Sequence, residues 1–202
     1  MASNIKPTAK EISLLNKVLL DSVKRNYSSD SFVLEERGEH ATLRRVFVSD
    51  LTPNYLALKP DKTKMKYFTS GYGGVQCDYI LLSEFEGNKV AVFVELKSSV
   101  HSQSAVATTP QMEGDNYEDY VSQLRSSSCL LDFLHAILAR FHRCYILGND
   151  YRRYFVVLHD AVMPPISEDI PYTRPVSNIT PEQAFIRKTT DGEHLSLCDL
   201  IR

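Results

Sequence analysis

Two neighbouring apolar segments, residues 75–82 and 90–97, place the strongest constraint on what this chain can fold into. Both are short and rich in β-branched and aromatic residues, and the sequence Glu-Gly-Asn lies between them. Such a pattern is typical of two β-strands joined by a tight turn. It predicts an antiparallel hairpin near the middle of the chain.

Helical patterns lie on both sides of the hairpin. A capping box that begins at Thr8, followed by apolar residues at helical spacing, predicts a first helix over residues 8–25. A second apolar stripe predicts a long helix, capped by Asp115 or Asn116 and ending near Phe141.

Further strands are expected at residues 32–36, 42–48 and 154–159, whereas prolines, glycines and a run of lysines predict a long surface loop over 50–74. The succession of strand, helix and strand predicts that 154–159 lies parallel to 90–97, with a right-handed crossover. We therefore expect an α/β fold with a mixed central β-sheet flanked by helices.

The chain beyond Met163 is rich in proline, which favours an extended or irregular path. A short helix is expected to begin at Thr180, because a capping residue is followed there by proline. An Asp-Gly turn at 191–192 predicts a hairpin that joins residues 186–190 to 194–200.

The chain has 202 residues, 43% of them hydrophobic, which fits a single domain over 1–202 with a core at about 8–159 and a C-terminal extension at about 164–202. The formal net charge of -2 excludes a strongly basic coat as the sole basis of nucleic-acid binding. No apolar run is long enough to span a membrane, and the four scattered cysteines form no metal-binding pair. We expect a soluble cytoplasmic protein without a membrane partner.

Three charged residues gather on the predicted hairpin. Side-chain alternation places Glu95 and Lys97 on one face of its second strand. A turn at residues 87–88 would pair Asp78 with Lys97, whereas a turn at 86–87 would pair Asp78 with Glu95. Either register brings the three side chains to the same face.

This cluster has the chemistry of a metal site. Two carboxylates about 4 Å apart repel each other by roughly 4 kcal/mol at an effective dielectric constant of about 20, and Lys97 offsets only part of this. Mg²⁺ would offset the rest, with Asp78, Glu95 and the carbonyl of Leu96 as expected ligands, and Mn²⁺ as an alternative ion. Such an ion lowers the pKa of a bound water, which Lys97 would position or help to deprotonate.

Asp78 on one strand, followed by Glu95-Leu96-Lys97 on the next, resembles the signature of the PD-(D/E)XK nuclease superfamily, which includes restriction-endonuclease-like and RecB-like enzymes. The predicted order of elements is also similar to that family's core: helix, strand, strand with Asp, strand with Glu-x-Lys, helix, strand. The resemblance covers about 8–159 and implies a restriction-endonuclease-like core. It implies that Asp78 and Glu95 bind metal, that Lys97 activates water, and that Gln123 joins the site. Cys77 departs from the family pattern, which has proline before the Asp.

The resemblance implies a Mg²⁺-dependent endonuclease that hydrolyses phosphodiester bonds, with DNA as the favoured substrate. The setting it implies is restriction, phage defence, a mobile element or repair. Because the net charge offers little attraction for nucleic acid, we expect a homodimer or a partner protein to strengthen binding. Candidate phosphate contacts, chosen by their charge, are Lys59, Lys62, Lys64, Lys66, Arg125, Arg152 and Arg153.

Two alternatives stay open. One is a non-catalytic module that retains the nuclease fold and binds nucleic acid or assembles with protein. The other is a scaffold in which Asp78, Glu95 and Lys97 form a structural ion-pair cluster on a strand surface.

Overall fold

The computed structural model describes residues 14, 24–25, 30–36, 41–51, 55–60, 76–97, 120–145, 150–160 and 177–201. They form a mixed α/β fold with two mixed β-sheets. The expected α/β class and mixed central sheet are therefore confirmed.

The larger sheet has six strands in the order β1-β4-β5-β6-β7-β8. Pairing is antiparallel from β1 to β6 and parallel from β6 to β8, which confirms the predicted hairpin and parallel crossover. The strands are β1 Lys24–Arg25, β4 Leu56–Leu58, β5 Tyr79–Phe85, β6 Asn88–Lys97, β7 Arg152–Asp160 and β8 Phe185–Thr189.

The hairpin between β5 and β6 turns at Glu86 and Gly87, whose φ angles are 50° and 72°. Two successive residues with positive φ define the tight turn that matches the twist of paired strands. Because Tyr79 lies opposite Val94 in the ladder, Asp78 comes opposite Glu95. The register in which the turn occupies 86–87 is thus the one that forms, and the alternative at 87–88 is wrong.

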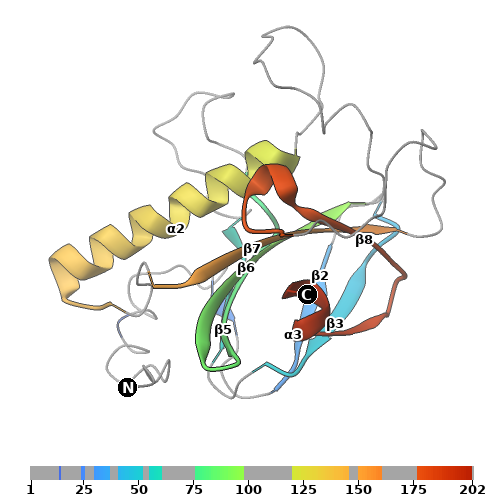
Figure 1. Cartoon of the computed structure of the whole chain (residues 1–202), viewed down its shortest axis with the longest axis horizontal. Coiled ribbons are helices and arrows are strands. Elements are labelled where there is room, and N and C mark those ends of the chain that lie inside the picture. Colours follow the sequence, from blue (N-terminus) through green and yellow to red (C-terminus); the bar gives the residue numbers. More distant parts are fainter. Residues whose placement is uncertain are drawn as a thin grey trace, which may run out of the picture.

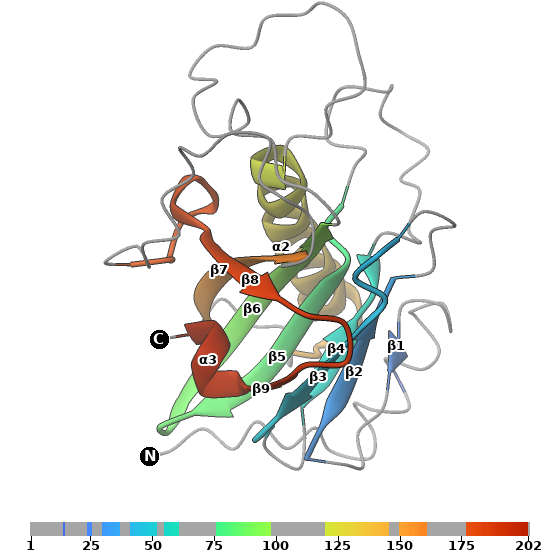
Figure 2. The same cartoon turned by 90° about the vertical axis from the view of Figure 1, so that its right-hand side faces the viewer.

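The two faces of the large sheet are covered differently (Figures 1 and 2). Helix α2, Tyr120–His142, lies on one face and packs on Phe93, Phe155 and Val157. On the other face lies a three-stranded sheet, followed by helix α3, which covers the remaining core. Its elements are β2 Phe32–Glu35, β3 Arg45–Ser49 and β9 His194–Ser196, with α3 at Leu197–Ile201. A sheet therefore covers much of the face on which a flanking helix was expected.

Two N-terminal predictions need correction. Leu14 is helical, but Lys24–Arg25 is strand β1, so the predicted first helix does not reach Arg25. The predicted surface loop contains β4, and residues 55–60 are buried between β1 and β5. A strand of three residues carries too short a pattern to be recognised in a sequence. Its side chains are buried in the cores on the two faces of the sheet.

Two C-terminal predictions also need correction. The turn at 191–192 exists, but it joins β8 of the large sheet to β9 of the small one, so it closes no hairpin. The Asp191 carboxylate accepts hydrogen bonds from the backbone amides of Arg44 and Arg45, at 2.8 and 2.6 Å, which fixes the turn on β3. The helix predicted at Thr180 is one 3-10 turn, Pro181–Gln183, and the Thr180 side chain does not cap it.

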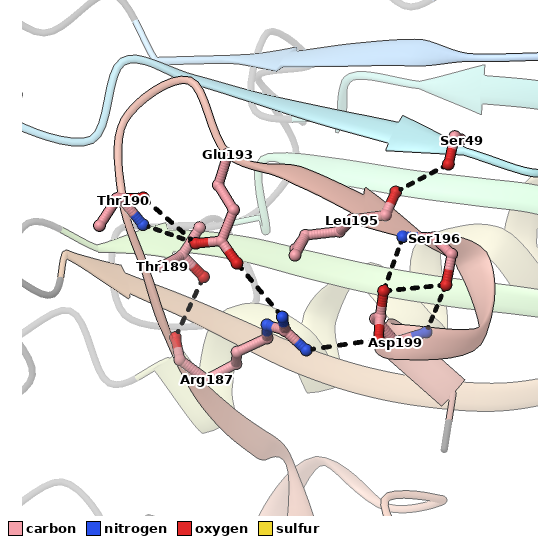
Figure 3. Close-up of polar contacts among 8 residues, drawn as sticks. All are labelled: Ser49, Arg187, Thr189, Thr190, Glu193, Leu195, Ser196 and Asp199. Carbon is pink, nitrogen blue, oxygen red and sulfur yellow. Dashed lines mark hydrogen bonds and ion pairs between the residues drawn. The ribbon is translucent and has the colours of Figure 1, made fainter.

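A polar network stabilises the segment from β8 to α3, which passes from the large sheet to the small one (Figure 3). Arg187 of β8 forms ion pairs with Glu193 at 3.2 Å and with Asp199 of α3 at 3.7 Å. Ser196 and Asp199 form a reciprocal capping box, because Ser196 N donates to Asp199 Oδ2 and Asp199 N donates to Ser196 Oγ.

Candidate active site

The predicted site lies where β5 begins and β6 ends. Asp78 immediately precedes β5. Glu95 and Lys97 are the last two residues of β6 on the face of the sheet that carries α2. Phe93, two residues before Glu95, belongs to the core under α2, and so does Ile80, two residues after Asp78. The alternation that fills this core therefore continues into three charged residues at the strand ends.

The two carboxylates interlock with the backbone of the opposite strand. Asp78 N donates to Glu95 Oε2 at 3.2 Å, and Leu96 N donates to Asp78 Oδ2 at 2.8 Å. Asp78 is 8% exposed and Glu95 is 3% exposed. Hydrogen bonds from backbone amides stabilise these buried carboxylates in one orientation.

Lys97 completes the predicted triad. Its Nζ lies 2.7 Å from Glu95 Oε1, and its side chain is 21% exposed while that of Glu95 is 4% exposed. Solvent thus reaches the ion pair from the side of Lys97, while Glu95 is buried. The structure brings Asp78, Glu95 and Lys97 together as the sequence predicted.

Helix α2 is anchored beside this cluster by Ser127. The Ser127 hydroxyl accepts from Cys77 N at 2.7 Å and donates to Gln76 Oε1 at 3.2 Å, and all three residues are buried. Burial raises the pKa of the Cys77 thiol well above its usual range; the hydrogen bond to Ser127 opposes this, and the charges of Glu95 and Asp78 reinforce it. Cys77 is therefore a neutral packing residue.

Gln123 is buried on α2, one helical turn before Ser127 and on the same face of the helix. It thus lies on the side of α2 that packs toward the cluster. The side chain of Leu96 packs in the core between the two sheets, so only the backbone of Leu96 is available to the carboxylates.

The structure describes only some of the candidate phosphate contacts. Lys62, Lys64 and Lys66 lie outside the described residues. Arg125 is an exposed residue of α2 that pairs with Glu182, and its hydrogen bond lowers the pKa of that carboxyl group.

Two further candidates are structural. Lys59 is buried: its Nζ donates to the carbonyl of Glu35 at 2.8 Å and to the Tyr79 hydroxyl at 3.1 Å, so it is not a solvated loop lysine. Arg153 pairs with Asp132 of α2 and donates to Ser128. Both cations hold elements of the fold together.

Arg152 lies at the wrong end of the sheet for a role beside the carboxylates. It pairs with Val90, whereas Glu95 pairs with Val157, five residues along β7, or about 16 Å away. A small pocket lined by Arg152, Phe85 and Tyr154 lies at that same hairpin end. Neither feature belongs to the candidate site.

Two residues near the cluster, His159 and Lys188, could not be predicted from the sequence. In the parallel ladders His159 pairs with Lys97, and Lys188 pairs with His159. No motif links these three positions, so strand register is the signal that connects them.

The donor set fits a hard divalent cation. Two buried carboxylates and a backbone carbonyl could supply oxygen ligands, since a carboxylate oxygen that accepts one hydrogen bond keeps a further lone pair. Among the described residues no group of three or more His, Cys, Asp or Glu could hold a metal. Mg²⁺ suits such a sparse site, because it is usually held by one or two carboxylates, with water and phosphate oxygens completing its shell.

Comparison of the chain with protein-family models, with curated proteins and with solved structures found no match. In the parts of the chain that the structure describes, no helix is long and apolar enough to cross a membrane.

Proposed function

We propose that this chain is a metal-dependent nuclease of the PD-(D/E)XK type that hydrolyses phosphodiester bonds, with DNA as the favoured substrate. One observation carries the proposal: Asp78 and Glu95 are buried and interlocked at the adjacent ends of β5 and β6, with Lys97 paired to Glu95 and partly open to solvent. A surface salt bridge does not need two carboxylates held under a helix. Metal-dependent hydrolysis of a phosphodiester does use paired carboxylates, because they hold the cation.

The order of elements supports the same proposal. Strands β4, β5 and β6 form an antiparallel meander, α2 follows, and β7 returns parallel to β6. This succession agrees with the order of strand, strand with Asp, strand with Glu-x-Lys, helix and strand that the resemblance implies.

Each residue has a separate role in the proposed reaction. Asp78, Glu95 and the carbonyl of Leu96 would hold the cation, which when bound would supply Lewis-acid chemistry toward water and the phosphate charge. Lys97, fixed by its ion pair with Glu95, orients the attacking water and stabilises the negative charge that develops on the phosphate. Gln123 supports the site from α2. A second copy or a partner protein strengthens substrate binding, since the net charge is -2.

Cleavage assays test the proposal. Supercoiled, linear duplex and single-stranded DNA, and RNA, are incubated with Mg²⁺ or Mn²⁺ and the wild type, Asp78→Asn, Lys97→Ala or Lys89→Ala. Lys89 is the matched control, because it lies on the same strand and forms a 2.7 Å ion pair with Asp150 at the opposite end. We expect the wild type and Lys89→Ala to cut, and the two site variants to lose at least about a hundredfold in rate.

One observation favours a second candidate, the non-catalytic module. Glu95 already engages both oxygens, with Asp78 N and with Lys97, so the cluster holds together by its own hydrogen bonds. That candidate predicts nucleic-acid binding without cleavage in any metal. A wild type that neither cuts nor binds Mg²⁺ by titration calorimetry would leave only the scaffold hypothesis.

A further inference from the structure

Three parallel strands end side by side next to the carboxylate pair. Lys97 of β6, His159 of β7 and Lys188 of β8 are consecutive partners in the two parallel ladders. Residues in register on neighbouring strands point to the same face of a sheet. The three side chains therefore form one row across the sheet, which we call the cationic row.

The face of this row is fixed by the residues two positions earlier. Val157 and Ile186 precede His159 and Lys188 by two, and both pack in the core under α2, as Phe93 of β6 does. The cationic row thus lies on the same face as Glu95 and one pleat beyond it. Lys97 and Lys188 are two strand spacings apart, about 9.5 Å between their Cα atoms.

The middle member of the row is buried and the outer member is exposed. His159 has no exposed surface, whereas Lys188 is exposed. Burial lowers the pKa of His159; the carboxylate of Asp160 opposes this shift, and the charge of Lys188 adds to it. A neutral imidazole separates the two lysines without adding a third positive charge between them.

We propose that the cationic row is a backbone-binding track of the candidate site, in which Lys188 binds the phosphate next to the one held at Asp78 and Glu95. The inference rests on the proposed function and deepens it. The substrate strand would run from the start of β5 across the ends of β6 and β7 to β8. His159 is a positioning residue, which packs between the two lysines and does not touch the substrate.

The charge arrangement supports phosphate as the ligand of this track. Asp78 and Glu95 repel an incoming phosphodiester, and Lys97 is already paired with Glu95. Cations on only one side of the carboxylates would hold the strand in one direction. Lys188 supplies such a cation on the β8 side, at a distance that a lysine side chain and a neighbouring phosphate can bridge.

The test measures binding with cleavage switched off. Anisotropy with a fluorescent 20-mer, as duplex and as single strand, is recorded in Ca²⁺ at several salt concentrations for the wild type, Lys188→Gln, Lys188→Arg and Arg152→Gln. Arg152 is the matched control, since it is an exposed cation at the opposite end of the sheet. Lys188→Gln should remove about one unit from the slope of log Kd against log salt, so that the increase in Kd between about 50 and 200 mM salt becomes roughly fourfold smaller. Lys188→Arg, which keeps the charge, and Arg152→Gln should both keep the slope of the wild type.

The outcomes separate this inference from the proposed function. A reduced slope for Lys188→Gln alone supports the track, even if no variant cleaves DNA. A slope equal to that of the wild type overturns the track, even if Asp78→Asn abolishes cleavage. Equal losses for Lys188→Gln and Arg152→Gln would mean diffuse attraction and also overturn it. Absence of binding by the wild type would overturn both proposals.

Discussion

Tyr79 joins the two sheets through its hydroxyl group. Lying on β5 of the large sheet, it donates to the carbonyl of Glu35 on β2 at 2.9 Å and accepts from the amide of Glu35 at 2.8 Å. Lys59, which follows β4, also donates to the Tyr79 hydroxyl, and its Nζ lies 4.7 Å from the centre of the Tyr79 ring. One phenol thus satisfies polar groups of Glu35 and Lys59, on the face of β5 opposite to the candidate site.

Removing this hydroxyl should weaken the fold. We expect Tyr79→Phe to lower the free energy of unfolding by about 1–3 kcal/mol, because the Glu35 amide and the buried Lys59 ammonium each lose an acceptor and the Glu35 carbonyl loses a donor. Urea unfolding followed by circular dichroism measures the change. Tyr145→Phe is the control, since Tyr145 is 62% exposed; equal stability of the two variants would contradict the role given to Tyr79.

His159 should make stability depend on pH below neutrality. Its pKa is lowered in the folded protein, mainly by burial, from about 6.5 in the unfolded chain. The unfolded chain therefore binds more protons as the pH falls below about 6.5, and stability decreases until the pH is below the folded pKa. Urea unfolding of the wild type and His159→Asn at pH 7.5, 6 and 5 should show that the wild type loses more stability on acidification. Parallel curves for the two proteins would refute this assignment.

At the scale of the element, the hairpin turn fixes the site. Moving the turn by one residue would take Asp78 away from its place opposite Glu95, because the ladder from Tyr79 to Phe85 is counted from that turn. Gly87 has open space where a Cβ would lie, so the cost of a side chain there comes from its positive φ alone.

Substitutions in the turn should act in opposite directions. Gly87→Ala should cost about 1–2 kcal/mol, which for a chain of this size lowers Tm by roughly 2–8 °C. Glu86→Asn should raise Tm, because Asn tolerates the φ of 50° better than Glu. Thermal unfolding by circular dichroism measures both, and a Tm unchanged in Gly87→Ala would contradict the strain assigned to a side chain at this positive φ.

At the scale of the whole molecule, the C-terminal residues belong to both layers. Strand β8 extends the large sheet, while β9 and α3 complete the core under the small one. Asn178 joins them further, since its side-chain amide donates to the carbonyls of Phe155 on β7 and Leu200 on α3, at 3.4 and 3.2 Å. The predicted C-terminal extension is thus an integral part of the fold.

A chain that ends at Asp160 should not fold cooperatively. It would expose the apolar surface that Leu195, Leu197 and Leu200 cover in the intact protein. We expect a broad thermal transition without native tertiary signals in near-ultraviolet circular dichroism, whereas full-length Arg187→Gln should keep a sharp one. A sharp transition of the truncated chain would show that the C-terminal residues are dispensable.

Local patterns in the sequence determined the central hairpin, the long helix, the parallel return strand and the meeting of Asp78, Glu95 and Lys97. These features depend on side-chain alternation and on contacts between adjacent elements, which a sequence displays directly. Tertiary structure alone decided the rest. Strand β4 is too short to show a period. The course of β8 and β9 into different sheets is set by pairing with the remote strands β7 and β3, and the row of Lys97, His159 and Lys188 arises from register between strands distant in the chain. Such features depend on pairing across the fold, and pairing becomes definite only when the sheets are assembled and their faces buried.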